Sequence, residues 1–321
     1  MIVLTGAAGF IGSCVAQQLI EQGHQDLVLV DRFDRPAHEP NYRDKAVREL
    51  VHRDQFFEWA ARHAADISLV IHLGARTDTA EFDEEIFNRL NLHYSQEMWK
   101  FCTLHQIPLI YASSAATYGD GSLGFVDSHE VVSKLHPLNP YGWSKQRFDQ
   151  WALAQEETPP FWAGLKFFNV YGPNEYHKGR MASVVFHAFN QIQQTGKLKL
   201  FKSHRPDFEH GQQSRDFIYV RDLVRVISFL SEQSPTSGLY NLGTGIARPF
   251  LDLGKQVFYA LGLEPQIEFI DTPLDIRETY QYFTQADMTK LSQAGYQSSF
   301  TTLEEGIQDY VTEFLVTGRC L

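Results

Sequence analysis

Three glycines at the N-terminus, Gly6, Gly9 and Gly12, follow a short apolar run and open a helical pattern. The first glycine permits a tight turn, the second lets backbone approach a pyrophosphate, and the third lets the helix pack closely on the strand. The N-terminus of such a helix presents free N–H groups to phosphates. Asp31 ends the next apolar run, where a carboxylate can accept from an adenosine ribose. This arrangement predicts a Rossmann-type unit that binds a dinucleotide.

The rest of the chain continues the alternation of short apolar runs with helical patterns, such as 11–22 and 90–105. This alternation predicts an α/β fold with a Rossmann-type doubly wound parallel sheet and a smaller C-terminal α+β substrate domain. We expect the NAD(P)-binding domain to span 1–170 plus 215–246, and the substrate-binding domain to span 171–214 plus 247–321. The expected strands are Ile2–Leu4, Leu27–Val30, Leu69–His72, Leu109–Tyr111 and Leu165–Phe168. A strand followed by a helix is expected over Arg215–Leu230, and a further strand ending in a turn over Tyr240–Gly245.

Composition argues against a nucleic-acid-binding, metal-binding or membrane-spanning protein. The net charge of −11 over 321 residues argues against non-specific nucleic-acid binding, which needs a basic surface. Three scattered cysteines, Cys14, Cys102 and Cys320, predict free thiols and no metal site. No signal peptide and no membrane-spanning run is recognisable, so we expect a cytoplasmic protein.

A second pattern, Tyr141-Gly-Trp-Ser-Lys145, indicates acid–base chemistry. Positions four apart share one face of a helix, so the phenol and the ammonium would lie side by side. A tyrosine titrates near ~10, and adjacent positive charge stabilises its phenolate. Upstream, Ser114 follows an apolar run at the sheet edge where ligands bind in open α/β folds, and it could hydrogen-bond a reacting oxygen.

These motifs do not decide between NAD and NADP. Asp31 favours NAD, because its carboxylate can accept from the ribose 2′-hydroxyl. Arg32 and Arg35 follow at once, and a guanidinium can bind the 2′-phosphate of NADP. Equally, these arginines could lie in a solvated loop.

Together, the glycines, Asp31, Ser114, Tyr141 and Lys145 resemble the extended short-chain dehydrogenase/reductase family over nearly the whole chain. Further segments look like blocks of that family, namely 72–75, 168–173, 215–220 and 240–245. Members of this family mostly act on nucleotide sugars, so the resemblance implies an enzyme with a nucleotide-sugar substrate and commonly a homo-oligomer.

Within that family, Glu175-Tyr-His-Lys178-Gly with His187, and the segment 283–287, are similar to the ADP-L-glycero-D-manno-heptose 6-epimerases. This resemblance implies epimerisation at C6 of ADP-heptose through a transient ketone, with NADP as cofactor. It implies Tyr141 and Lys178 as two acid/base groups, assisted by Ser114 and Lys145. It also favours NADP over NAD.

The same resemblance carries over two sets of binding residues. The expected cofactor-binding residues are Gly6, Gly9, Phe10, Ile11, Gly12, Asp31, Arg32, Arg53, Leu73, Gly74, Ala75, Arg76, Thr77, Asn91, Lys145, Val170 and Lys178. The expected substrate-binding residues are Asn169, Arg180, His187, Phe201, Lys202, Ser203, His204, Arg215 and Tyr280.

The chain departs from this pattern near the substrate. Arg180 stands where those enzymes usually have serine, Arg76-Thr-Asp replaces small residues, and 204–214 is longer than expected. Two alternatives stay open, namely another nucleotide-sugar epimerase or reductase, such as a hexose 4-epimerase, and a non-catalytic NADP(H)-binding sensor. A dehydratase is disfavoured, because Ala115 and Ala116 replace its carboxylic acid.

Overall fold

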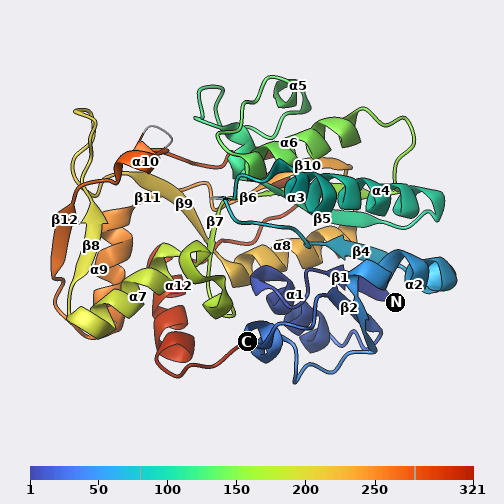
Figure 1. Cartoon of the computed structure of the whole chain (residues 1–321), viewed down its shortest axis with the longest axis horizontal. Helices are drawn as coiled ribbons and strands as arrows, with labels where there is room; N and C mark the ends of the chain where they lie inside the picture. The colour runs from blue at the N-terminus through green and yellow to red at the C-terminus, as the bar shows by residue number, and fades with distance from the viewer. Residues whose placement is uncertain (80, 278–279) are drawn as a thin grey trace.

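A computed structural model describes residues 1–79, 81–277 and 280–321. Its centre is a seven-stranded sheet, ordered β10-β6-β5-β4-β1-β2-β3, in which all the paired neighbours are parallel (Figure 1). The strands are β1 Ile2–Thr5, β2 Leu27–Asp31, β3 Glu49–His52, β4 Leu69–His72, β5 Leu109–Ser114, β6 Trp162–Phe167 and β10 Gly238–Leu242.

Helices cover both faces of this sheet, because successive strand side chains point to opposite sides. One face packs against α1 and α8, and the other against α2, α4 and α6. Val3 and Leu4, adjacent in β1, accordingly belong to two separate buried clusters. The bounds are α1 Phe10–Glu21, α2 Phe56–His63, α3 Glu84–Phe87, α4 Tyr94–Leu104, α5 His129–Val132, α6 Pro140–Leu153 and α8 Val220–Gln233.

Two smaller sheets lie beyond the carboxyl ends of the large sheet (Figure 1). In one, β9 pairs with β7 in parallel and with β11 in antiparallel orientation, and in the other β12 pairs with β8 in parallel. The bounds are β7 Asn169–Tyr171, β8 Leu198–Phe201, β9 Ser214–Tyr219, β11 Ala247–Pro249, β12 Ile267–Ile270, α7 Val184–Thr195, α9 Phe250–Ala260, α10 Leu274–Arg277, α11 Thr289–Gln293 and α12 Leu303–Asp309.

Short 3-10 and π turns join these elements. The 3-10 turns are η1 Pro36–Asn41, η2 Arg53–Gln55, η3 Ala64–Asp66, η5 Ala115–Tyr118 and η6 Tyr176–Met181, and the π turns are η4 Asn88–His93 and η7 Tyr310–Leu315. Among the described residues, no helix combines the length and the apolar character that crossing a bilayer requires.

The structure confirms the doubly wound parallel sheet and each strand expected from the sequence. It adds β3, a strand that the sequence did not predict. The segment 215–219 is a strand, as expected, but it pairs with β7 and β11 and not with the large sheet. The exact boundary between the two domains stays a prediction.

Candidate functional site

The glycine turn between β1 and α1 is shaped by close backbone contacts. Gly6 has a φ of +69°, and a Cβ there would lie 2.7 Å from the backbone nitrogen of Gly74. A Cβ on Gly12 would lie 2.2 Å from the carbonyl oxygen of Gly6. A Cβ on Gly9 would meet only that same oxygen, at 3.1 Å, so the middle of the turn faces open space. A phosphate group fits such a turn.

The N-terminus of α1 offers the donors that a phosphate needs. No side chain of the described residues caps the N-terminus of this helix. The first N–H groups, at Phe10 and Ile11, can therefore donate to a phosphate. Asp31 supports the turn, since its Oδ2 accepts from the Ala8 N–H at 2.9 Å and its Oδ1 accepts from the Arg32 N–H at 2.7 Å. Each oxygen retains a lone pair with which a ribose hydroxyl could be bound.

Two arginines lie beside Asp31 at the carboxyl edge of the sheet. Asp31 in β2 and His52 in β3 are register partners. The residues that follow them, Arg32 and Arg53, are therefore neighbours. Arg32 pairs with Asp34 at 2.7 Å, and Arg53 with Asp54 at 3.3 Å. Both guanidiniums are partly exposed and could turn toward an added phosphate.

The segment after β4 closes over the glycine turn. The Gly74 N–H donates to Thr5 Oγ1 at 3.1 Å, next to Gly6. Asn91, buried in η4, accepts from the Arg76 N–H at 2.8 Å and donates to the Arg76 carbonyl oxygen at 2.9 Å. Of the predicted cofactor residues 73–77, Leu73 and Gly74 therefore lie against the glycine turn, and Asn91 holds the segment through the backbone of Arg76.

Ser114 and Tyr141 meet where β5 ends and α6 begins. Asn139 caps α6 by accepting from the Gly142 N–H at 2.8 Å, and Pro140 is the first helical residue. Ser114 Oγ accepts from the Ala116 N–H at 3.1 Å. Burial raises the pKa of Tyr141, and the side-chain hydrogen bond with Ser114 acts in the opposite direction. A phenolate at Tyr141 therefore needs further positive charge.

Lys145 lies one turn further along α6. Its Nζ donates to the carbonyl oxygen of Ala112 at 2.8 Å, within β5. Burial lowers the pKa of Lys145 to about 8, while the Asp149 carboxylate acts to raise it. Tyr141 and Lys145 thus occupy one face of α6 against the end of β5, as the spacing predicted.

A fully buried ion pair lies behind Lys145 and was not predicted from the sequence. Lys166 Nζ lies 2.7 Å from Asp149 Oδ2, with both side chains 0% exposed. Ser113 Oγ also donates to Asp149 Oδ2, at 2.7 Å, and Tyr111 donates from its hydroxyl to Oδ1 at 3.1 Å. Asp149 follows Lys145 by one helical turn, a spacing that could have indicated its place in this network.

Lys178 in η6 lies near the start of α1. Its ammonium lies 5.3 Å from the centre of the Phe10 ring, at the start of α1. Burial lowers the pKa of Lys178, opposed by the carboxylate of Glu175. Glu175 is itself buried and accepts from Ser183 Oγ at 2.7 Å. The structure therefore places Lys178 beside the glycine turn, although the two are far apart in sequence.

Arg215 in β9 is a buried cation between aromatic rings. Its guanidinium lies 5.6 Å from the Phe250 ring centre and 5.5 Å from the Tyr280 ring centre. Within residues 1–79, 81–277 and 280–321, it donates to the carbonyl oxygens of Ser214, at 3.0 Å, and of Gln281, and no carboxylate forms an ion pair with it. Burial lowers the pKa of Arg215 to about 10. A buried guanidinium that is hydrogen-bonded to carbonyl oxygens, but paired with no carboxylate of the described residues, favours an anionic ligand. Phe201 lies against Tyr280, with ring centres 6.2 Å apart.

The other predicted substrate residues are less tightly grouped. His204 Nδ1 and the Tyr282 hydroxyl share a hydrogen bond of 2.8 Å, and the Ser203 hydroxyl lies 3.4 Å from the same phenol. Lys202 pairs with Asp271 at 3.1 Å on the surface. His187 lies 3.3 Å from the carbonyl oxygen of Arg180, whereas Asn169 and Val170 belong to β7.

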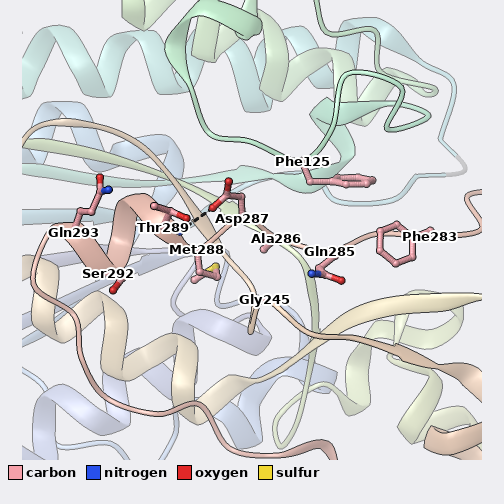
Figure 2. A pocket seen from close by; sticks show the side chains of 10 residues that line it. All are labelled: Phe125, Gly245, Phe283, Gln285, Ala286, Asp287, Met288, Thr289, Ser292 and Gln293. Carbon is pink, nitrogen blue, oxygen red and sulfur yellow. Dashed lines mark hydrogen bonds between the residues drawn. The ribbon is translucent and has the colours of Figure 1, made fainter.

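A separate hollow of about 700 Å³ lies beside the segment 283–289 (Figure 2). Phe125 and Phe283 form one end of it, and Asp287 bonds the Thr289 N–H at 2.9 Å along its wall. Among the described residues that line it, none is a predicted site residue. This hollow is therefore distinct from the group of residues around the glycine turn.

The glycine turn, the Tyr141–Lys145 pair and the parallel sheet together are typical of a dinucleotide-dependent α/β enzyme. Residues 2–243 match the model of the NAD dependent epimerase/dehydratase family, and the chain belongs to that family. It is 44% identical to the ADP-L-glycero-D-manno-heptose-6-epimerase of Fusobacterium nucleatum, over 98% of each chain. It is 45% identical to the enzyme of the same name from Nitratidesulfovibrio vulgaris, over 99% of each. The resemblance inferred from the sequence is confirmed.

Solved structures agree with this assignment. The Helicobacter pylori ADP-L-glycero-D-manno-heptose-6-epimerase superposes with a TM-score of 0.80 at 26% identity, covering 97% of this chain and 95% of that one. The Bacillus cereus UDP-glucuronic acid 4-epimerase, solved with UDP-glucuronic acid and NAD, has a TM-score of 0.78 at 23% identity, covering 97% and 99%. At that identity the second comparison shows the fold alone.

Proposed function

We propose that this chain converts ADP-D-glycero-D-manno-heptose to ADP-L-glycero-D-manno-heptose by inverting C6, with NADP as a retained cofactor. The proposal is supported by the relatives at 44% and 45% identity over nearly their full length, which carry that enzyme name. The structural observation that carries it is the position of the half-buried Lys178 beside Phe10. Dinucleotide binding alone would not require a half-buried lysine from the second domain.

Direct removal of a proton from C6 is difficult, because nothing in the sugar makes that C–H acidic. The glycine turn and Asp31 would hold the dinucleotide, and its nicotinamide would supply reversible hydride transfer at C6, so that the sugar could pass through a ketone and be reduced on the other face. Tyr141 would take the proton of the C6 hydroxyl, and Ser114 would hold the same oxygen by a hydrogen bond. Lys145 would stabilise the phenolate of Tyr141, since its ammonium lies on the same helix face.

Lys178 would be the second acid/base group. After the ketone has turned in the site, its oxygen needs a proton donor on the opposite side from Tyr141. Burial lowers the pKa of Lys178, which makes its ammonium a better proton donor than an exposed lysine. The two groups come from separate elements, α6 and η6, which suits approach from two directions.

The nucleotide part of the substrate would lie toward the smaller sheets. Arg215 would bind the diphosphate, because a buried guanidinium without a carboxylate partner gains a counter-ion when that group binds. The rings of Phe201 and Tyr280 would contribute apolar contacts beside it. Asn169, His187 and 202–204 remain proposed substrate residues by resemblance.

For the cofactor, family membership gives dependence on NAD-type dinucleotides. We infer NADP because Arg32 and Arg53 are neighbours at the strand ends beside Asp31. Two guanidiniums at that position suit a 2′-phosphate, whereas Asp31 alone would suit a free 2′-hydroxyl.

The direct test is incubation of the purified protein with ADP-D-glycero-D-manno-heptose, with the configuration at C6 followed by NMR. We expect an equilibrium mixture of both epimers with no net consumption of added NADP. UDP-glucose serves as the comparison substrate, because inversion at its C4 would support a hexose 4-epimerase instead. Binding of NADP(H) without turnover of either sugar would support a non-catalytic sensor.

Two further expectations follow from the resemblance and stay predictions. We expect a homo-oligomer, which light scattering on the purified protein would test. We also expect a cytoplasmic location, which cell fractionation would test.

A further inference from the structure

Four charged side chains connect the segment after β4 with η6. Both carboxylate oxygens of Asp78 accept from Arg180 Nη2, at 3.0 and 3.1 Å. Arg76 Nη2 lies 3.5 Å from Asp78 Oδ2 and 3.4 Å from Glu81 Oε2. We call Arg76, Asp78, Glu81 and Arg180 the ion network. It contains Arg76, from the segment after β4, and Arg180, from η6.

On one side, the ion network is anchored to the helix that carries Tyr141. Asn91 bonds both backbone groups of Arg76, and its Nδ2 donates to Ser144 Oγ at 2.9 Å. Ser144 Oγ in turn donates to the carbonyl oxygen of Tyr141 at 2.7 Å. A continuous series of hydrogen bonds therefore runs from the backbone of Tyr141 to the backbone of Arg76, whose side chain belongs to the ion network.

On the other side, the ion network ends two residues from Lys178. Gly179, between Lys178 and Arg180, has a φ of +54°, and a Cβ there would meet nothing within 4 Å. This turn is thus lightly packed at its tip. One more contact joins the two segments, from Thr79 Oγ1 to Met181 Sδ at 3.8 Å. Contacts from outside the turn must therefore help to fix its position.

We infer that the Asp78–Arg180 pair is a positioning device that fixes the turn bearing Lys178 relative to the helix bearing Tyr141. This inference rests on the proposed function, in which those two residues handle protons on opposite sides of one carbon. It assigns Arg180 to positioning and not to substrate contact. The pair is suited to this role, because Asp78 is only 21% exposed although Arg180 is 64% exposed.

A double-mutant cycle tests the inference in the NADP-loaded protein. The variants are Asp78→Asn, Arg180→Gln and their combination, with kcat and KM for ADP-heptose epimerisation as readouts. We expect each single change to lower kcat about tenfold with little change in KM, and the double variant to be no worse than either single variant. Arg180→Lys should recover part of kcat. Arg48→Gln is the matched control, because Arg48 forms an exposed pair with Asp26 at 2.7 Å and should keep full activity.

Two kinetic outcomes would overturn the inference. One is additive loss in the double variant. The other is a KM that rises in Arg180→Gln but not in Asp78→Asn, as expected if the guanidinium binds substrate directly.

Hydrogen exchange separates this inference from the proposed function. The Lys178 N–H bonds the Glu175 carbonyl oxygen, and the Ala182 N–H bonds that of Gly179, so both report on the turn. We expect several-fold faster exchange over 176–182 in Asp78→Asn and in Arg180→Gln, but not in Arg48→Gln. Unchanged exchange would overturn the inference whatever reaction the protein catalyses. Faster exchange in a protein that does not invert C6 would support the positioning and refute the proposed function.

Discussion

The ammonium of Lys178 lies 5.3 Å from the centre of the Phe10 ring, so a residue of η6 adjoins the first residue of α1. This contact brings a half-buried ammonium group from the smaller part of the molecule to the helix end that would face the cofactor phosphates. It joins two motifs, the glycine turn and the 175–179 segment, that the sequence shows only as separate patterns. The proposed chemistry depends on this contact between the two parts.

Removing either proposed acid/base group should abolish epimerisation while leaving cofactor binding intact. We expect Tyr141→Phe and Lys178→Met each to lower the rate by about 10²–10⁴-fold, the usual contribution of a positioned acid or base. NMR detection of C6 inversion and the absorbance of retained cofactor measure the two effects. Tyr259→Phe and Lys134→Met, both at exposed positions, are the controls. Near-normal turnover in both site variants would refute the two-base assignment.

Cofactor preference should depend on the arginines at the ends of β2 and β3. We expect Arg32→Ser and Arg53→Ser each to weaken NADPH binding by about 10–100-fold, since a hydrogen bond to a charged group contributes about 1.5–3 kcal/mol. NADH binding should change little. Fluorescence titration with the two reduced cofactors measures this, with exposed Arg62→Ser as control. Equal weakening for both cofactors would argue against a 2′-phosphate site.

Arg215 should set the affinity for the nucleotide sugar. We expect Arg215→Lys to raise KM by about tenfold or more with a smaller effect on kcat, because an ammonium cannot reproduce the planar guanidinium between Phe250 and Tyr280. Steady-state kinetics on ADP-heptose measures this, and thermal unfolding checks that the variant is folded. An unchanged KM would place the diphosphate elsewhere.

The free energy of unfolding should decrease as the pH is lowered, because His72 is buried in its neutral form. Burial lowers the pKa of His72 to about 3, with help from the positive charge of Lys145, and the ring lies between Thr5 Oγ1 at 2.6 Å and Ser95 Oγ at 3.0 Å. An unfolded histidine titrates near ~6.5, so below that pH the unfolded state binds one more proton than the folded state. Stability from this group is complete above ~6.5 and is lost as pH falls toward 3. Between pH 7 and 5 we expect a loss of about 2 kcal/mol from His72.

Urea unfolding at pH 7, 6 and 5 measures this loss. His72→Gln should be less stable at pH 7 but should show a pH slope smaller by about one proton. The exposed His24→Gln should keep the slope of the unaltered protein. An identical slope in His72→Gln would show that another group causes the pH dependence.

Replacing only one partner of the buried Asp149–Lys166 pair should strongly destabilise the folded protein. We expect Asp149→Asn or Lys166→Met alone to reduce the free energy of unfolding by about 3–5 kcal/mol, because each leaves an uncompensated buried charge. The double variant should lose less than the sum of the two. Urea denaturation measures all three, and strict additivity would contradict the coupling.

Much of the architecture could be predicted from local patterns. The glycine turn, the apolar runs and the Tyr141–Lys145 spacing each depend on neighbours in sequence, and each appears in the structure at the expected position. Strand β3 was missed because only Val51 in Glu49–His52 is buried, so its apolar pattern is weak. Asp149 and Lys166 were missed because their partnership joins α6 to β6, which no local pattern shows.

By itself, the sequence determined the parallel sheet, the dinucleotide turn and the chemical groups available for proton transfer, because glycine conformations, apolar periodicity and helical spacing act over a few residues. Only the tertiary structure decided which distant groups meet. It placed Lys178 against Phe10, left Arg215 without a carboxylate partner among the described residues, and joined Arg180 to Asp78. Such pairings arise from packing between elements and from burial, which act only once the chain has folded.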